Sequence, residues 1–383
     1  MKISDTISYI GVNDHALDLF EGQYEVPNGM AYNSYVIRDE KIAVLDTVDG
    51  HFTEEWLGKL EAELSGGTPD YLVIHHMEPD HSAGILVFSE KYPEAKLVAS
   101  AAAFNMMKNY FGTDFSDRRI VVKEGNELAL GTHTLTFIGA PMVHWPEVLM
   151  SYEEREGVLF SADAFGKFGA LDCEEEWDCE ARRYYIGIVG KFGTNVQAVL
   201  KKAASLSVRT ICPLHGPVLS GDLSHYLSLY DTWSSYLPET KGVLIAYTSV
   251  YGNTKAAAEL LKEELLGLGV PKLEIFDLAR DDMAEAVEGA FRYSDIVLAT
   301  TTYNGSIFPY MQDFIERLKE RNFKNRRLAL IENGSWAPTA AKSMKQLLEN
   351  CEGLSFLDTV TIRGAVNEAG KEAIRALAAR LAE

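Results

Sequence analysis

The sequence predicts an α/β protein of two consecutive domains, the second of them a doubly wound parallel sheet. A chain of 383 residues is longer than one compact core usually holds, which favours two domains of roughly 150 to 250 residues. Short strand-like runs separated by turns fill the N-terminal half, whereas strands and helices alternate regularly in the C-terminal half. The two halves are therefore expected to differ in strand arrangement.

The N-terminal half has the pattern of a mixed α/β domain in which helices separate only some of the strands. Residues 53–64 and 82–92 have helix-like spacing, and a longer helical region is expected between Cys173 and Ser207. The expected strands are NSYVI (33–37), KIAVLDTV (41–48), YLVIHH (71–76), KLVAS (96–100), RIVVK (119–123), TLTFIGAP (134–141) and GVLFSAD (157–163).

The C-terminal half begins after a Pro-containing polar stretch at 237–241, which predicts a boundary between a domain at 1–238 and a domain at 241–383. Parallel strands require crossover helices, so five strand and helix pairs predict a doubly wound parallel sheet. The strands are expected at 242–249, 272–278, 295–301, 327–332 and 359–364, and the helices at 253–269, 282–294, 311–321, 337–350 and 368–383.

The composition is that of an ordinary soluble protein, with 47% hydrophobic and 24% charged residues. No run approaches the roughly 18 to 20 apolar residues of a membrane span, and the N-terminus lacks signal-peptide features, so we expect a cytoplasmic protein. The net charge of -20 argues against nucleic acid as a partner. The cysteines form no CxxC pair, which argues against a disulfide framework or a rubredoxin-type site; they are Cys173, Cys179, Cys212 and Cys351.

The stretch HHMEPDHSAG at 75–84 concentrates metal-ligating residue types at the end of an expected strand, where α/β proteins commonly build their sites. His76, Glu78, Asp80 and His81 form an HxExDH pattern. Side chains two positions apart in an extended segment point the same way, so we expect the first three to converge and the last to face a neighbouring direction. This geometry favours two adjacent metal ions.

Three further donors follow apolar strands beside turn-forming Gly or Pro, namely His144, Asp163 and His215. Any one of them is as well explained as a polar strand-end residue bonded to the backbone, but together with HxExDH they indicate a metal site. His75 lies one step along the strand from His76, so it is expected to face the opposite side and to be structural. The remaining histidines, His15, His51, His133 and His225, lie outside ligand-like contexts.

The HxExDH motif with these three strand-end donors resembles the metallo-β-lactamase fold, and its glutamate-containing form resembles the flavodiiron proteins. The resemblance covers essentially the whole chain, because that family joins an N-terminal metallo-β-lactamase-like αββα domain to a C-terminal flavodoxin-like domain. It implies a diiron centre in which His76, Glu78 and His144 hold one iron, Asp80, His81 and His215 hold the other, and Asp163 bridges them.

Glu78 distinguishes this motif from the HxHxDH pattern that is usual in zinc hydrolases of the same fold, where imidazole suits the borderline zinc ion. With Glu78, the donor set has four histidines and three carboxylates, a harder and more anionic set that stabilises ferric iron. A bridging Asp163 would hold two ions with open positions facing each other, which suits one diatomic molecule or two NO molecules.

Three loops of the C-terminal half favour a bound FMN. YTSVYGNTK (247–255) places hydroxyls and backbone N–H groups at a helix N-terminus, as phosphate binding requires, and resembles the flavodoxin phosphate loop. TTTYNGSIFPYM (300–311) and ENGSWAPTA (332–340) follow strands at the sheet edge where such folds bind ligands, and the latter departs from the commoner GSxGW form. The candidate FMN-binding residues are Ser249, Val250, Tyr251, Gly252, Asn253, Thr254, Thr302, Tyr303, Asn304, Gly305, Gly334, Ser335 and Trp336.

The resemblance implies an oxidoreductase that relays electrons through FMN to two irons and reduces O2 to water, NO to N2O, or both. It also implies an external electron donor such as rubredoxin or a reductase, and a head-to-tail homodimer or a dimer of dimers. Two alternatives remain open, a dinuclear zinc hydrolase fused to a flavodoxin domain and an electron-transfer protein with a structural metal site.

Overall fold

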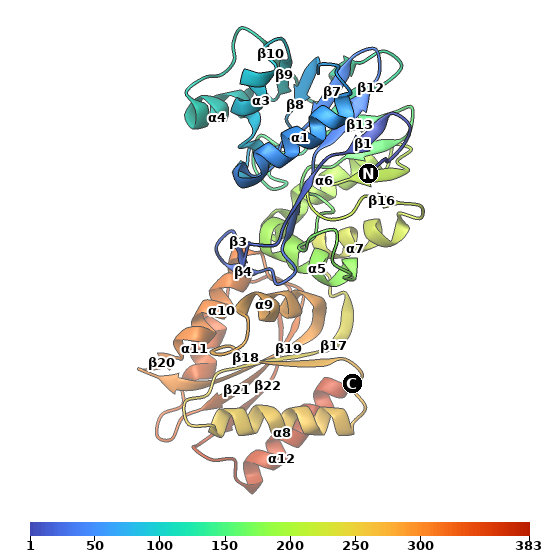
Figure 1. The fold of residues 1–383 in the computed structure, drawn as a ribbon. Helices are drawn as coiled ribbons and strands as arrows, with labels where there is room; N and C mark the ends of the chain where they lie inside the picture. The colour runs from blue at the N-terminus through green and yellow to red at the C-terminus, as the bar shows by residue number, and fades with distance from the viewer. The chain divides into compact units, whose positions relative to one another are not determined.

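The computed structural model describes residues 1–383, which divide into two compact units, Met1–Asp231 and Thr232–Glu383 (Figure 1). The division lies inside α7 (Ser224–Ser234), earlier in the chain than the expected boundary at 238–241. The residues after Asp231 already bond within the second unit: Trp233 donates to Glu239 over 2.7 Å, and Arg326 donates to the carbonyl of Tyr236 over 2.8 Å.

The first unit contains two six-stranded sheets, and within each sheet the strands lie side by side in chain order. In the first sheet only, the chain forms four further short strands between its first strand and the neighbouring strand. The first sheet consists of β1 (Ile7–Tyr9), β6 (Tyr35–Arg38), β7 (Ile42–Leu45), β8 (Tyr71–Val73), β9 (Lys96–Ala99) and β10 (Arg119–Val121). The second consists of β11 (Glu127–Ala129), β12 (Thr134–Gly139), β13 (Leu149–Glu153), β14 (Val158–Phe160), β15 (Thr210–Cys212) and β16 (Leu219–Ser220). Two small hairpins, β2 (Val12–Asp14) with β5 (Met30–Tyr32) and β3 (Leu19–Phe20) with β4 (Tyr24–Glu25), complete the strands.

One hydrophobic core joins the two sheets of this unit. Tyr35 and Val73 of the first sheet belong to the same buried cluster as Phe137 and Phe160 of the second, so the inner faces of the sheets pack on each other. The helices are α1 (Thr53–Leu64), α2 (Pro79–Ser82), α3 (Ile85–Lys91), α4 (Ala101–Phe111), α5 (Trp177–Tyr184), α6 (Gly193–Ala203) and α7, with a π-helical turn at Tyr185–Val189 and 3₁₀ turns at Gly50–Phe52 and Gly190–Phe192.

Helices pack against the outside of this pair of sheets. Trp56 of α1 is fully buried, donates to Ser34 next to β6 over 2.9 Å, and lies against Phe88 of α3. On the other side, Lys202 of α6 donates to the carbonyl of Gly139 in β12 over 2.9 Å. The predicted αββα arrangement is therefore confirmed, and none of the helices has the length and apolar character needed to cross a lipid bilayer.

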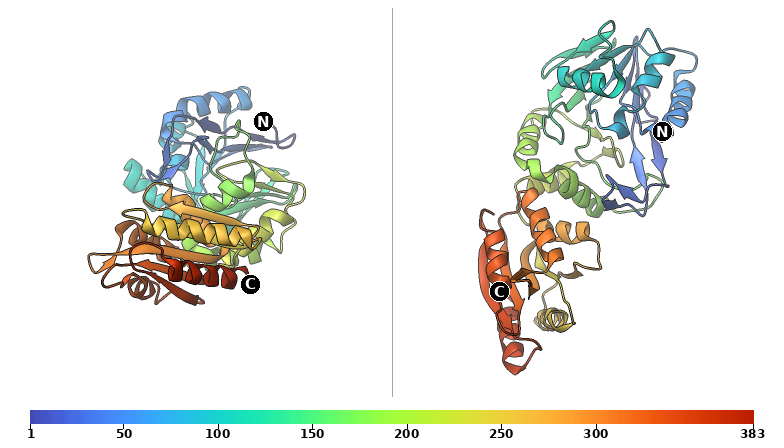
Figure 2. Two further views of the ribbon diagram at one scale, coloured as in Figure 1. Left: turned by 90° about the horizontal axis from the view of Figure 1, so that it is seen from below. Right: turned by 90° about the vertical axis from the view of Figure 1, so that its left-hand side faces the viewer.

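The second unit is a parallel sheet with helices on both faces, in the order β18, β17, β19, β21, β22. Helices α8 and α12 contact each other on one face, as Figure 2 shows, while α9 and α11 contact strands from the other. The strands are β17 (Thr240–Tyr247), β18 (Leu273–Asp277), β19 (Tyr293–Tyr303), β20 (Ser306–Ile307), β21 (Arg327–Asn333) and β22 (Ser355–Ile362), and the helices are α8 (Asn253–Gly267), α9 (Met283–Arg292), α10 (Pro309–Glu320), α11 (Ala340–Leu347) and α12 (Glu368–Ala382).

This order confirms the predicted doubly wound sheet. From β17 the chain first adds β18 on one side and then continues with β19 on the other side. The connections after β17 and β19 therefore run in opposite directions, and their loops diverge at the carboxyl ends of the strands. Such a reversal opens a crevice for a ligand, and the three predicted FMN loops follow β17, β19 and β21.

Candidate functional site

The seven donors predicted in the first unit lie in loops after strands of both sheets. His76 and Glu78 follow β8, and α2 begins directly after Glu78 and carries Asp80 and His81. The other three follow strands of the second sheet: His144 comes after β12, Asp163 after β14 and His215 after β15. All except Glu78 are buried.

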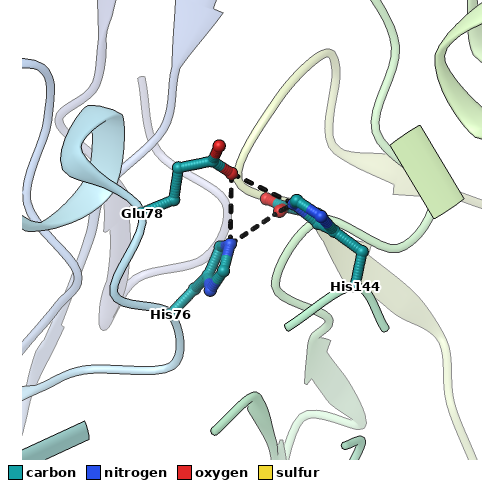
Figure 3. Close-up of side chains that lie close together, drawn as sticks. His76, Glu78 and His144 are labelled. Atoms are coloured by element: carbon teal, nitrogen blue, oxygen red, sulfur yellow. Dashed lines mark hydrogen bonds and ion pairs between the residues drawn. The ribbon is translucent and has the colours of Figure 1, made fainter. Parts of the chain in front are cut away.

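The structure brings these seven residues together in two groups. The ligand atoms of His76, Glu78, His144 and Asp163 lie within 4.8 Å of one another, and so do those of Asp80, His81 and His215. Figure 3 shows the side chains of His76, Glu78 and His144 pointing toward one another. Glu78 Oε2 lies 3.3 Å from His76 Nε2 and 3.0 Å from His144 Nε2.

Asp163 lies between the two groups and has one oxygen toward each. Its Oδ2 is 3.3 Å from His76 Nε2 and 3.1 Å from His144 Nε2. Its Oδ1 is 3.2 Å from His81 Nε2 and 3.8 Å from His215 Nε2. A carboxylate in this position can bind two ions at once, one through each oxygen.

The polar atoms of this cluster fit metal ions better than they fit one another. Both carboxylate oxygens of Asp80 and of Asp163 are buried without a hydrogen bond, although imidazole nitrogens lie nearby. The Nε2 atoms of His81 and His215 face each other over 3.0 Å. Buried polar groups are normally paired, so this many donors aimed at shared points without aligned hydrogen bonds indicates positions for cations.

Protonation in the metal-free cluster follows from its carboxylates. Burial alone would lower the pKa of His144, but the adjacent carboxylates of Asp163 and Glu78 outweigh it and raise this pKa to about 9. Burial would also lower the pKa of His76, but the negative charge of Asp163 outweighs it and raises this pKa well above its ordinary value. Burial raises the pKa of Glu78, but the bonds from His144 and His76 outweigh it and lower that pKa to about 2. Without metal, protons on the imidazoles balance the carboxylates.

The convergence expected for the first three residues of the HxExDH motif is wrong. Pro79 begins the helical turn α2, so the chain is not extended between Glu78 and His81. The turn carries Asp80 away from Glu78 and places its carboxylate 3.3 Å from the Nε2 atom of His215. The motif therefore supplies donors to both groups by changing conformation in its middle.

His75 confirms the structural role predicted for it. Its Nδ1 atom lies 2.5 Å from Asp46 Oδ2 and its Nε2 atom lies 2.8 Å from Ser151 Oγ. The order of Asp, His and Ser is that of a hydrolase triad, but all three residues are buried, so no substrate reaches the hydroxyl. His15 lies at the surface beside Asp172 and Cys173, far more exposed than the seven donors.

Two contacts that support the donors were not predicted. Glu147 Oε1 accepts a hydrogen bond from His76 Nδ1 over 2.8 Å, and the carbonyl of Ala31 accepts one from His215 Nδ1 over 2.8 Å. Such partners fix the ring orientation and leave Nε2 free for a metal. Neither contact leaves a local signal in the sequence, because Glu147 lies 71 positions from His76 and the other partner is a backbone carbonyl.

The loops of the second unit enclose a pocket of about 280 Å³. Ten predicted residues line it, namely Ser249, Val250, Tyr251, Asn253, Thr254, Thr302, Tyr303, Gly334, Ser335 and Trp336. Thr301, Asn333, Ala337 and Gly364 line it as well and were not predicted. The pocket lies at the N-terminus of α8, whose free N–H groups favour an anion.

Three predicted residues lie outside the lining. Gly252 precedes α8 with φ +87 and donates its N–H to Ser249 Oγ over 3.1 Å, so it shapes the loop. Asn304 and Gly305 form the left-handed turn between β19 and β20, with φ values of 49 and 74. Their positive φ angles suit this hairpin turn, and their role in cofactor binding stays a prediction.

Aromatic side chains stand at the rim of this pocket. Tyr251 is 92% exposed and Trp336 is 90% exposed, which is unusual for large apolar rings in water. Thr302 accepts hydrogen bonds from the N–H groups of Thr339 and Ala340 at the start of α11, over 2.9 and 3.2 Å. That hydroxyl therefore ties two of the pocket loops together.

Two protein families match consecutive parts of the chain. Residues 30–216 match the model of the ODP family beta lactamases, and residues 244–370 match that of a flavodoxin domain. Among curated proteins, the nitric oxide reductase of Moorella thermoacetica is 29% identical over 360 residues, covering 91% of this chain and 89% of that protein. The anaerobic nitric oxide reductase flavorubredoxin of Salmonella arizonae is 27% identical over 361 residues, covering 91% of this chain and 75% of that protein.

Solved structures match the whole chain. The rubredoxin oxygen:oxidoreductase of Desulfovibrio gigas superposes with a TM-score of 0.91 at 25% identity, covering 100% of this chain and 97% of the other. The flavodiiron protein of Giardia intestinalis superposes with a TM-score of 0.92 at 23% identity, covering 100% and 95%, and shows the same fold. The domain order, the two donor groups and these relatives agree, and the chain is similar to the flavodiiron proteins over its whole length.

Proposed function

We propose that this protein reduces O2 to water, NO to N2O, or both, at a two-iron site, with electrons relayed through FMN. The observation that carries the proposal is the position of Asp163, which has one oxygen toward each of two groups of buried donors. The names of the relatives support the same chemistry, since they are nitric oxide reductases and an oxygen oxidoreductase.

In this proposal each donor group holds one iron and Asp163 binds both. His76, Glu78 and His144 form one position, and Asp80, His81 and His215 form the other. A bound iron pair supplies electrons one at a time and open positions for a small gas molecule. Glu78 in place of an imidazole makes the donor set more anionic than that of the zinc hydrolases and favours iron in its ferric state.

Aromatic rings of the chain enclose the second position. The rings of Phe20, Tyr32 and Tyr184 lie 5.5, 5.9 and 5.4 Å from the ring of His215, measured between centroids. A wall of this kind keeps bulk water from the donors and favours a small, weakly polar substrate over a hydrolysable ester or amide.

The pocket of the second unit is proposed to hold FMN. The loop at 249–254 offers hydroxyls and the N–H groups of the α8 N-terminus to the phosphate, while Tyr251, Tyr303 and Trp336 are placed to cover the ring system. Burial of exposed aromatic rings against a planar cofactor would remove apolar surface from water and so favour binding.

The electron donor, the assembly and the location are proposed on the family's pattern. An external rubredoxin or reductase fits this chain, because its four cysteines are widely spaced and include no CxxC pair. A head-to-tail homodimer would bring the FMN of one subunit to the donor groups of the other. We propose the cytoplasm as the location, because reduced flavin and iron are compatible with a reducing compartment.

Metal and flavin analysis followed by rapid kinetics tests the proposal. Protein purified without added metal is expected to contain iron and FMN, and the anaerobically reduced protein is expected to reoxidise with O2 or NO in a stopped-flow spectrometer. About two zinc ions and negligible iron per chain would instead support the hydrolase alternative. Failure to reoxidise with either gas would support simple electron transfer. Steady-state rates with both gases and one artificial donor decide which gas is preferred.

A further inference from the structure

The two donor groups have matching ligands but different support behind them. Each group has one carboxylate of its own, Glu78 or Asp80, two imidazoles, and one oxygen of Asp163. Behind the first group, the buried carboxylate of Glu147 bonds to Nδ1 of His76. The two groups therefore differ in the residues that bond to the ligating imidazoles and not in the ligands themselves.

Glu147 is firmly placed and its charge is poorly compensated. It is only 3% exposed, and Oε1 accepts from both His76 Nδ1 at 2.8 Å and the Met77 N–H at 2.9 Å. Its Oε2 is buried without a hydrogen-bond partner, and its ion pair is with His76. A buried carboxylate of this kind is stabilised by positive charge delivered through the imidazole.

The second group has only neutral support. Nδ1 of His215 bonds to the carbonyl of Ala31 over 2.8 Å, and Nδ1 of His81 is buried with no hydrogen-bond partner. A carbonyl orients the ring as well as a carboxylate does, but it adds no net charge. A carboxylate also makes Nε2 a stronger donor, because it draws the Nδ1 proton toward itself.

We propose that Glu147 is a positioning residue that makes the His76, Glu78 and His144 position the tighter of the two, so that the first metal ion bound by each chain occupies it. This inference rests on the proposed function for the identity of the site, but it concerns the order of metal loading and not gas reduction. The carboxylate acts through His76, whose Nε2 faces the other donors of that group.

Titration of metal-free protein with Co2+ under anaerobic conditions tests the order. Wild-type protein is expected to bind in two steps, the first about 10- to 100-fold tighter than the second, a range typical for support of a ligating histidine. The visible absorbance of bound Co2+ reports each step. Asp80→Asn should remove the second step and leave the first, whereas Glu78→Gln should remove the first, which assigns the steps to their groups.

Glu147→Gln separates charge from shape, because the amide oxygen can still accept from His76 and Met77. It is expected to weaken the first step about tenfold or more, to leave the second unchanged, and to alter the Co2+ spectrum of the first step only. Glu153→Gln is the matched control: Glu153 is a buried carboxylate 3.0 Å from Nδ1 of His133, outside both groups. It should change neither step.

Specific outcomes overturn the inference. They are an unchanged first step in Glu147→Gln, equal weakening of both steps, or a change in the second step alone. If Glu147→Gln does not fold, by circular dichroism, Glu147→Asp takes its place; it keeps the charge one methylene farther from Nδ1, and an unchanged first step there overturns the inference as well. Because Co2+ binding requires no turnover, these results are independent of whether the iron protein reduces O2 or NO.

Discussion

Metal binding to the first unit should strengthen about tenfold when the pH rises from 7 to 8, because a proton must leave His144 before its Nε2 can bind a metal. The pKa of this imidazole is about 9 in the metal-free protein, since the carboxylates of Asp163 and Glu78 lie beside it and outweigh its burial. Below that pH the ring holds a proton, so metal affinity falls as the pH falls. At pH 7 removing the proton costs roughly 2.7 kcal/mol, and at pH 8 roughly 1.4 kcal/mol, at about 1.36 kcal/mol per pH unit.

The raised pKa values of His76 and His81 act in the same direction. The assay is competition for Zn2+ with a chromophoric chelator at pH 7.0, 7.5 and 8.0, each corrected for the chelator's own protonation. Calorimetry in two buffers of different ionisation enthalpy counts the protons released. An affinity that does not change with pH, or binding without proton release, would refute the reasoning, whereas Asp163→Asn should flatten the dependence.

Three other changes test separate parts of the molecule. Asp163→Asn should lower the metal content while FMN content stays the same, by metal analysis and flavin absorbance; full metal content would contradict the shared position of that carboxylate. Gly252→Ala places a Cβ at φ +87, which costs about 1 to 2 kcal/mol, and should weaken FMN binding severalfold in a fluorescence titration. Gly267→Ala at the end of α8 should leave FMN affinity unchanged. Trp56→Ala should lower the free energy of unfolding in urea by about 3 to 5 kcal/mol, because the buried indole also donates to Ser34; a cost below about 1 kcal/mol would contradict that packing.

Elements with a regular apolar period could be predicted from the sequence. Helix α1 spans the predicted residues 53–64, because Trp56, Leu57, Leu60 and Leu64 form one buried face. The central strands β17, β19 and β21 could be predicted because each contains a buried, largely apolar run. The edge strand β22 begins at Ser355, before the predicted residues 359–364, because its first residues are mostly exposed and lack such a run.

Strand β13 shows why other elements could not be predicted. All five of its residues are buried, yet they include Ser151 and Glu153, which break any apolar pattern. Their burial depends on distant partners: Ser151 bonds to His75, and Glu153 lies beside His133. The short strands β1 to β4 have two or three residues each and carry too little pattern to be recognised.

The donors of the metal site could be predicted by residue type and by their positions after strands, but their division between two groups could not. That division depends on one helical turn at Pro79–Ser82. Side chains alternate in direction in the extended part of the motif, whereas in the turn they follow the helical period. The role of Glu147 depends on a contact with His76 across 71 positions of the chain. Local pattern carries no information about either.

The positions of the tryptophans give this protein a separate optical reporter for each proposed cofactor. Of the five, Trp336 is almost fully exposed at the rim of the flavin pocket, whereas Trp56, Trp177 and Trp233 are buried. Trp145 lies beside the metal donors, with its ring 5.1 Å from that of His76. Quenching of the red-shifted emission of Trp336 would follow flavin uptake, and quenching of Trp145 would follow iron uptake. The filling of both sites can thus be recorded separately in one unlabelled sample.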